Sequence, residues 1–282
     1  MPIELMYITN RTEIAEIAQA SGIDRIFLDM EYIGKQERQG GMNTVQLHHT
    51  TEDVRRLRGV LHETKLLVRC NPIHDRTARY DSTESEVDRA VNSGADILML
   101  PFFKSAQEVR RFVHSVNGRA RVSLLLETPQ AVENLDQILA VGGIDEIHIG
   151  LNDLHLGYHM KFMFELLADG TVDRLCDKIR QAGISYGFGG VARVGTGTLP
   201  AEYILGEHYR LGSDRVILSR SFCNLSKEKD VSAIREKMQT GVAGIRAFES
   251  TLCRWNSDMF RANHERLCAC VQDIVKKAET IE

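Results

Sequence analysis

The chain has 282 residues, of which 43% are hydrophobic, 26% are charged and only 5 are prolines, a composition that argues against long disordered tracts. The 35 basic and 39 acidic residues give a formal charge of -4, so no basic surplus is present to bind a nucleic-acid backbone. No apolar run reaches the roughly 18 residues of a membrane span, and the N-terminus lacks a signal-peptide pattern. The 6 scattered cysteines form no CxxC pair. We therefore expect reduced thiols, a cytoplasmic location and no membrane partner.

Short runs rich in β-branched and apolar residues recur along the chain and predict strands. Most are almost continuously apolar, as expected of parallel strands covered on both faces, and amphipathic segments lie between them. The predicted strands span residues 4–10, 24–32, 65–73, 95–101, 121–127, 145–151, 184–190 and 214–222. This alternation predicts an α/β fold, a (β/α)8 TIM barrel over residues 1–228. A doubly wound sheet is the alternative, because periodicity does not reveal how a sheet closes.

A recurring Gly-x-Asp pattern marks the boundaries between predicted helices and strands. It begins at four positions: Gly22, Gly94, Gly143 and Gly212. A glycine there is typical of a helix end, so we expect each helix to stop just before the next strand. Ser105 and Glu108 have the spacing of a capping box and predict a helix that begins at this point.

The strand signal stops near Asp230, and residues 229–282 are predicted to be a C-terminal extension of two or three helices. Several of its apolar side chains need to be covered: Phe248, Leu252, Trp255, Met259, Phe260 and Leu267. We expect this extension to pack against another subunit of an oligomer. A cap on its own barrel is the alternative.

The functional side chains of such barrels lie at the carboxyl ends of the strands. Glu127 and Asp153 each follow a strongly apolar strand, where an unpaired charge is costly. Two neighbouring carboxylates, completed by water and substrate oxygens, suit Mg²⁺ or Mn²⁺. The alternative is that each acid merely caps the helix that follows it.

Other strand ends also carry candidate residues. Arg69 ends the third strand and either pairs with a carboxylate such as Glu31 or holds a substrate carboxylate. The segment 187–203 is rich in glycine, and Gly189 and Gly190 are its substrate-binding candidates. Its backbone amides either cradle an anion or simply form a tight turn. His148 alternates with apolar neighbours, and no recognised histidine metal motif is present.

These strand ends match the motifs of a known family. Residues 124–160 combine a Glu-Thr strand end, an A-x-x-N-x-x-x-I helix and a G-x-D-x-x-x-I-G-x-x-D-L segment. LDMEY at 28–32 matches a D-x-E-H strand end, and VRCNP at 68–72 matches a V-R-V-N strand. Over residues 5–225 the chain resembles the HpcH/HpaI aldolase and citrate lyase superfamily, whose members are metal-dependent (β/α)8 barrels that act on pyruvate-like units.

The resemblance implies roles for the residues at the barrel mouth. Glu127 and Asp153 would ligate Mg²⁺ or Mn²⁺, and Arg69 would bind the carboxylate or enolate oxygen of a pyruvyl unit. Three backbone amides would hold the substrate carboxylate: those of Gly150, Leu151 and Asn152. Asp29 and Glu31 would form a polar floor beside the metal-bound water. The resemblance also implies a homo-oligomer, a trimer or hexamer, with C-terminal helices exchanged between neighbours.

Two departures from the family pattern leave the catalytic base open. The pyruvate aldolases carry a histidine where this chain has Tyr32, and a glutamine where it has Leu125. The candidates for the base are a metal-bound water, Tyr32 itself, and the loop histidines His48 and His49.

The hypothesis that follows is a metal-dependent aldolase, a carbon–carbon lyase. It would cleave or join a 2-keto acid and an aldehyde through a pyruvate-type enolate. A sugar-derived keto acid is one candidate substrate. The first alternative is an acyl-CoA lyase or thioesterase, with Lys35, Arg38 and the 187–197 loop as candidates for binding the nucleotide. The second is an inactive barrel used for binding or assembly.

Overall fold

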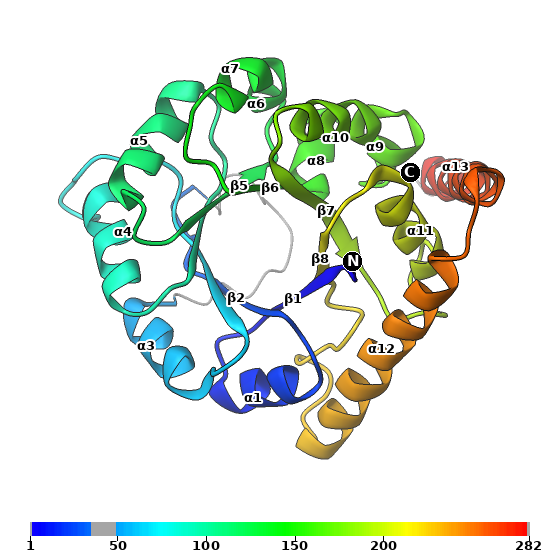
Figure 1. Cartoon of the computed structure of the whole chain (residues 1–282), viewed down its shortest axis with the longest axis horizontal. Helices are drawn as coiled ribbons and strands as arrows, with labels where there is room; N and C mark the ends of the chain where they lie inside the picture. The colour runs from blue at the N-terminus through cyan, green and yellow to red at the C-terminus, as the bar shows by residue number, and fades with distance from the viewer. Residues whose placement is uncertain (1, 35–48, 281–282) are drawn as a thin grey trace.

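The computed structural model describes residues 2–34 and 49–280. Parallel strands form a closed barrel in the order β1 to β8, with β8 paired to β1 (Figure 1). This confirms the predicted (β/α)8 barrel over the doubly wound sheet. The strands are β1 (Glu4–Ile8), β2 (Arg25–Asp29), β3 (Lys65–Arg69), β4 (Ile97–Leu100), β5 (Arg121–Leu126), β6 (Glu146–Ile149), β7 (Ser185–Val191) and β8 (Arg215–Leu218).

Helices surround the barrel and cover the outward faces of its strands (Figure 1). They are α1 (Thr12–Ala20), α3 (Thr51–Val60), α4 (Thr83–Asn92), α5 (Ala106–Val116), α6 (Pro129–Glu133), α7 (Leu135–Leu139), α8 (Leu151–Gly157), α9 (Glu165–Ala168), α10 (Thr171–Gln181), α11 (Ala201–Leu211), α12 (Val231–Leu252) and α13 (Ser257–Glu279). The predicted capping box opens α5, where Glu108 N donates to Ser105 Oγ at 3.3 Å and Ser105 N donates to Glu108 Oε2 at 2.9 Å. Within the described residues, no helix combines the length and the apolar content needed to cross a bilayer.

The Gly-x-Asp sites both end helices and tie neighbouring strands together. Their glycines are left-handed, a conformation that strains other residues, with φ of 82° at Gly22, 102° at Gly94, 86° at Gly143 and 72° at Gly212. Their aspartates accept hydrogen bonds from the preceding strand, at 2.8 Å from Leu5 N to Asp24, 2.8 Å from Leu66 N to Asp96 and 2.7 Å from Val122 N to Asp145. The repeated motif therefore marks the starts of β2, β4, β6 and β8.

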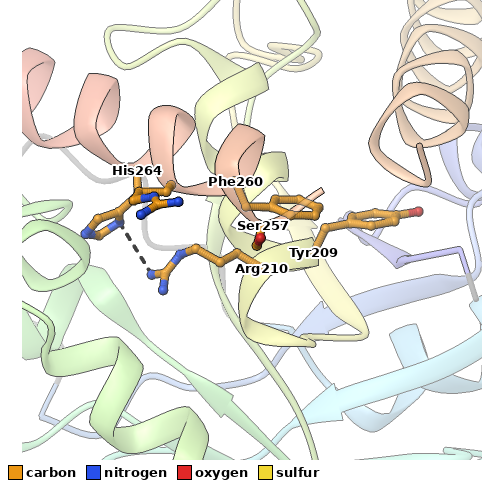
Figure 2. A pocket seen from close by; sticks show the side chains of 6 residues that line it. Tyr209, Arg210, Ser257, Phe260 and His264 are labelled. Atoms are coloured by element: carbon orange, nitrogen blue, oxygen red, sulfur yellow. Dashed lines mark hydrogen bonds between the residues drawn. The ribbon is translucent and has the colours of Figure 1, made fainter. Parts of the chain in front are cut away.

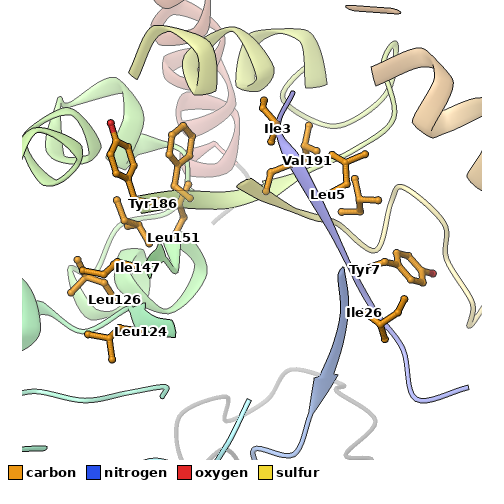
Figure 3. Close-up of a cluster of buried hydrophobic side chains, with 14 of the residues drawn as sticks. Ile3, Leu5, Tyr7, Ile26, Leu124, Leu126, Ile147, Leu151, Tyr186 and Val191 are labelled. Carbon is orange, nitrogen blue, oxygen red and sulfur yellow. The ribbon is translucent and has the colours of Figure 1, made fainter. Parts of the chain in front are cut away.

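Two separate apolar cores form because side chains alternate between the two faces of each strand. The smaller core fills the barrel interior and consists of Met6, Phe27, Leu67, Ile97, Met99 and Leu125. The larger core lies between the strands and the helices and includes Ile26, Leu126 and Ile147 (Figure 3). A residue two positions beyond an interior one therefore also points inward.

A buried charge cluster closes the amino-terminal end of the barrel. Glu146 is 0% exposed, and its Oε1 lies 2.6 Å from Arg25 Nη1. Arg215 also pairs with the Glu146 carboxylate, and Arg121 Nη2 lies 3.5 Å from its Oε2. Burial by itself raises the pKa of Glu146, but Arg215 and Arg25 outweigh it and lower the pKa to about 2. The cluster leaves the opposite, carboxyl-terminal end as the open mouth.

The C-terminal extension consists of the two long helices α12 and α13, which pack on the barrel of their own chain. Helix α12 contacts α1 and α11, and α13 contacts α11 and α9 (Figure 1). Leu252 and Leu267 are buried in these contacts. Within one chain the extension therefore packs as a cap on its own barrel, which was the alternative to packing against another subunit. Met259 remains 46% exposed, and a contact with a second subunit stays a prediction.

Candidate active site

Strand alternation carries the predicted site residues into the mouth of the barrel. Phe27 and Leu67 fill the interior, and Asp29 and Arg69 follow them by two positions and lie opposite each other in the register of β2 and β3. Glu127 follows interior Leu125 in the same way at the end of β5. The fold thus brings the ends of different strands, far apart in sequence, to one polar patch.

Arg69 forms the centre of this patch. Its Nε and Nη2 donate to Asp29 Oδ1 and Oδ2 at 2.8 and 2.7 Å, a two-pronged pair that orients the guanidinium. Its Nη2 also lies 3.4 Å from Glu31 Oε2, and its Cζ lies 5.5 Å from the centre of the Phe27 ring. Burial alone would lower the pKa of Arg69, but the carboxylates of Asp29 and Glu31 raise it above its usual range. Arg69 is therefore a fixed cation, and its Nη1 makes no hydrogen bond to the described residues.

Glu127 lies next to this cation in a buried position with 4% of its surface exposed. Phe102 N donates to Glu127 Oε1 at 3.0 Å, and Phe102 adopts a left-handed backbone with φ of 51° to do so. Burial raises the pKa of Glu127, Arg69 opposes this, and Asp153 and Glu31 raise it further. Negative charge at this point of the mouth is therefore only partly compensated.

The Glu127 and Asp153 pair has the chemistry of a site for a hard divalent cation. Asp153 lies in the first turn of α8, and its carboxylate forms no ion pair within the part of the chain that the structure describes. Asp153 raises the pKa of Glu127, because the two carboxylates repel each other. A cation bound between them would relieve this repulsion, and carboxylate oxygens are ligands of Mg²⁺ and Mn²⁺. Residues 2–34 and 49–280 contain no group of three or more His, Cys, Asp or Glu side chains arranged to hold a metal. Any cation here would therefore depend on water and substrate for its remaining ligands.

Gly150, which precedes α8, allows the close approach of this helix to Glu127. A Cβ at position 150 would lie 2.8 Å from Glu127 Cβ and 3.1 Å from its Oε2. We expect Gly150→Ala to displace the Glu127 carboxylate and to lower turnover by about tenfold or more, since misplacing a reacting group by a fraction of an ångström is costly. Steady-state kinetics measure the effect. Gly142→Ala is the matched control, because nothing lies within 4 Å of that Cβ and its turnover should not change.

The backbone amides predicted to hold a carboxylate lie at the start of α8. The side chain of Leu151 is buried, whereas Asn152 is exposed. Gly189 has φ of 55°, and a Cβ there would lie 2.8 Å from Leu151 Cδ1, so β7 and α8 approach closely at this point. Gly190 lies in the strand pairing of β7 with β8. Substrate binding by these glycines and amides stays a prediction.

His148 lies inside the barrel, where its Nε2 is 3.1 Å from the Gly189 carbonyl oxygen. Burial lowers the pKa of His148 to about 4, so the ring is neutral at physiological pH. It therefore supports the β6 and β7 ends as a neutral hydrogen-bonding group.

Tyr32 lies beside Tyr80. Its ring lies 5.6 Å from that of Tyr80, and burial followed by the charge of Glu86 raises its pKa. Its backbone N donates to Asn71 Oδ1 at 2.9 Å, and Asn71 Nδ2 donates to Glu86 Oε1 at 2.8 Å. A catalytic role of Tyr32 stays a prediction.

Glu86 and Phe102 both support the site, although no role was predicted for either from the sequence. Glu86 holds Asn71, and through it the chain that follows β2. The available signal was an acidic residue within the apolar stripe of α4, beside buried Val87 and Ala90. Nothing in the local sequence marks the Phe102 amide, because only the fold brings it to Glu127.

Part of the predicted site falls outside the described residues. Lys35, Arg38 and His48 belong to the segment 35–48. His49 is described and lies next to Asp53 at the start of α3, where it contributes to lowering the pKa of that carboxyl.

Together, the fold and these strand ends define a (β/α)8 barrel with an arginine and several carboxylates at its carboxyl-terminal mouth. A sequence profile of the HpcH/HpaI aldolase/citrate lyase family matches residues 5–188, and the chain belongs to this family. Among curated proteins, none matches the chain.

Solved structures share the fold at low sequence identity. The HpcH/HpaI aldolase from Desulfitobacterium hafniense DCB-2 is 18% identical with a TM-score of 0.60, over 87% of this chain and 93% of that one. A HpcH/HpaI aldolase/citrate lyase family protein from Burkholderia cenocepacia J2315 is 16% identical with a TM-score of 0.61, over 83% and 94%. The citrate synthase SbnG is 14% identical with a TM-score of 0.59, over 88% and 95%.

Proposed function

We propose that this protein is a divalent-metal-dependent carbon–carbon lyase of the aldolase type that acts on a 2-keto acid through a pyruvate-type enolate. The observation that carries the proposal is the convergence of Arg69, Glu127 and Asp153 at one end of the barrel. Membership of an aldolase and citrate lyase family supports the same chemistry. An aldehyde would be the second product of cleavage, or the second substrate of condensation.

The residues of the mouth divide the work of stabilising negative charge. Glu127 and Asp153 would hold Mg²⁺ or Mn²⁺, which when bound supplies a Lewis acid for the carbonyl of the keto acid. Arg69 Nη1 would donate to the substrate oxygen on which negative charge develops, because Asp29 already occupies its Nε and Nη2. The fork to Asp29 keeps the guanidinium in place during the reaction.

The proton acceptor differs from the histidine of the family. The Tyr32 ring lies against Tyr80, whereas the side chain of Glu31 is 3% exposed and lies next to Arg69. We assign Glu31 as the group that takes the proton from the C4 hydroxyl in cleavage. Arg69 lies close enough to keep this carboxylate oriented toward the mouth.

The decisive experiment is a titration with oxalate, a planar dianion that mimics the pyruvate enolate. We expect metal-stripped wild type to bind oxalate tightly only after Mn²⁺ is added, as measured by calorimetry. Asp153→Asn should abolish this metal-dependent binding. Asp136→Asn, at an exposed aspartate of α7, is the matched control and should bind as wild type does. Equal oxalate binding with and without Mn²⁺, or full binding by Asp153→Asn, would remove the basis for a metal–enolate site.

A further inference from the structure

A second cluster of titratable side chains lies far from the mouth, where α13 packs on the barrel helices. Its centre is Glu207 of α11, which is 0% exposed. Glu207 Oε2 accepts from Arg210 Nε at 2.8 Å and lies 2.9 Å from His264 Nδ1, on α13. Arg210 Nη1 also donates to Asp173 Oδ1 of α10 at 2.7 Å. The four groups connect three helices, and Figure 2 shows His264 and Arg210 side by side.

The Glu207 carboxylate determines how the His264 imidazole is protonated. A carboxylate can only accept, so Nδ1 of His264 carries the proton that faces Glu207. Arg210 Nη2 lies 3.4 Å from the same Nδ1, and both groups donate to Glu207 Oε2. In the neutral ring, Nε2 therefore presents its lone pair on the opposite side.

That lone pair meets a cysteine thiol. Cys268 follows His264 by one helical turn on α13, and its Sγ lies 3.5 Å from His264 Nε2. Sγ also lies 3.8 Å from the Ala168 carbonyl oxygen, the last residue of α9. His264 thus contacts the Cys268 thiol through Nε2 and the Glu207 carboxylate through Nδ1. In enzymes, this arrangement of nucleophile, base and orienting acid activates the nucleophile.

We propose that Cys268 is a nucleophilic thiol, activated by His264 and Glu207, that forms mixed disulfides with low-molecular-weight disulfides. The Sγ–H proton passes to His264 Nε2 while Sγ attacks one sulfur of the incoming disulfide. A new S–S bond forms, the old S–S bond breaks, and the leaving sulfur departs as a thiolate that takes up a proton. The incoming disulfide is the oxidant, and the product is one mixed disulfide at Cys268 and one free small thiol.

A cavity of about 380 Å³ lies next to the His264 ring and is lined by Tyr209, Arg210, Ser257, Phe260, Arg261 and His264 (Figure 2). Cys268 is not among these lining residues, and both guanidinium groups of the cavity already pair with carboxylates, Arg210 with Glu207 and Asp173, and Arg261 with Asp258. The cavity therefore does not select the charge of the incoming disulfide, and oxidised glutathione serves as the probe because it is a small soluble disulfide.

The other cysteines of the chain provide an internal comparison. All six are free, and Cys70, Cys176 and Cys223 are buried. Cys253 is exposed and Cys270 is partly exposed, so both are at least as accessible as Cys268. Accessibility alone therefore predicts that Cys253 reacts first, whereas the proposal predicts Cys268.

The pH dependence follows from the groups that face His264 and Cys268 from each packed helix. The hydrogen bond to Glu207 raises the pKa of His264, and burial followed by Glu207 raises the pKa of Cys268. Asp173 and Arg210 are the remaining charges of the cluster and partly cancel each other. Below the pKa of His264 its Nε2 is protonated and cannot accept, so the rate should rise as the pH rises through that pKa.

The test follows modification of the reduced full-length protein by oxidised glutathione, with acid quenching and peptide mapping by mass spectrometry. We expect Cys268 to react at least about tenfold faster than Cys253, a modest share of what general-base assistance supplies. His264→Gln should remove this advantage, whereas His62→Gln, at an exposed histidine elsewhere, should leave it intact. The readout does not depend on catalysis at the mouth.

Two outcomes would overturn the proposal. One is modification of Cys253 at a rate equal to or above that of Cys268 in wild type. The other is an unchanged Cys268 rate in His264→Gln. If the substitution loosens α13, Cys270 on the same helix should also be modified faster. A modification rate of Cys268 that rises together with that of Cys270 also counts against the proposal.

Discussion

Glu127→Gln should lower turnover by about 10² to 10³-fold, the range found when one group that stabilises developing charge is removed. The amide keeps an oxygen for the Phe102 N–H, so the local structure is preserved. The raised pKa of Glu127 means that folding disfavours its ionised form, and stability falls as the pH rises above the usual range for glutamate. A neutral glutamine avoids this cost. At neutral pH the variant should therefore be at least as stable as wild type.

Two measurements separate this result from a structural defect. Steady-state kinetics with a keto-acid substrate give the loss of turnover, and thermal unfolding gives the stability. Glu133→Gln, at an exposed glutamate of α6, is the control and should change neither. Full metal-dependent turnover in Glu127→Gln would contradict the assigned role of Glu127, and a large drop in melting temperature would indicate a structural role instead.

The largest effect on stability is expected for Glu146→Gln at the closed end of the barrel. The substitution removes the carboxylate that the buried Arg25 and Arg215 share, and leaves Arg25 with Glu4 and Arg215 with Asp214. We therefore expect a loss near the lower end of the roughly 3 to 5 kcal/mol that breaking a buried pair costs. Urea unfolding at neutral pH measures this loss. Glu16→Gln, at an exposed position of α1, should remain within about 0.5 kcal/mol of wild type.

Lowering the pH of wild type should remove the stability that the Glu146 carboxylate contributes. The pKa of Glu146 is lowered from 4.5 to about 2, so its contribution is present above pH 4.5 and is lost as the pH falls toward 2. A shift of this size corresponds to about 3 kcal/mol. The difference in unfolding free energy between wild type and Glu146→Gln should therefore shrink between pH 5 and pH 2. A difference that stays constant over this range would contradict the pairing.

The order of strands and helices could be predicted because its signals are local. Each strand is a short apolar run, and several helices are followed by a glycine whose positive φ is strained for other residues, as at Gly22. Alternation along β2 and β3 also places Asp29 and Arg69 on the inward face. The convergence of strand-end charges then follows from the fold class.

The partners of these side chains could not be predicted, because they come from distant segments. Arg69 was expected either to pair with a carboxylate such as Glu31 or to hold a substrate carboxylate. It lies 3.4 Å from Glu31, but its two-pronged partner is Asp29. The amide that holds Glu127 belongs to Phe102, on a loop after another strand. The direction of the Tyr32 ring depends on Tyr80, which follows β3 and precedes α4.

The surface against which the C-terminal extension packs could not be predicted either. Its sequence predicts helices with apolar side chains that must be buried, but it does not say against which surface. In the structure, α13 packs on α11 and α9 and brings His264 to Glu207. The helical spacing of His264 and Cys268 is local, whereas the buried carboxylate that orients the ring is not.

By itself, then, the sequence determined the order of strands and helices, the ends of the helices and the face of each strand. These properties depend on backbone propensity and on apolar periodicity, which act over a few residues. Tertiary structure decided the closure of the sheet, the Arg69–Asp29 fork, the Phe102 contact and the Glu146 cluster. Buried charges and polar groups must find partners wherever the chain brings them, and that requirement is met only in three dimensions.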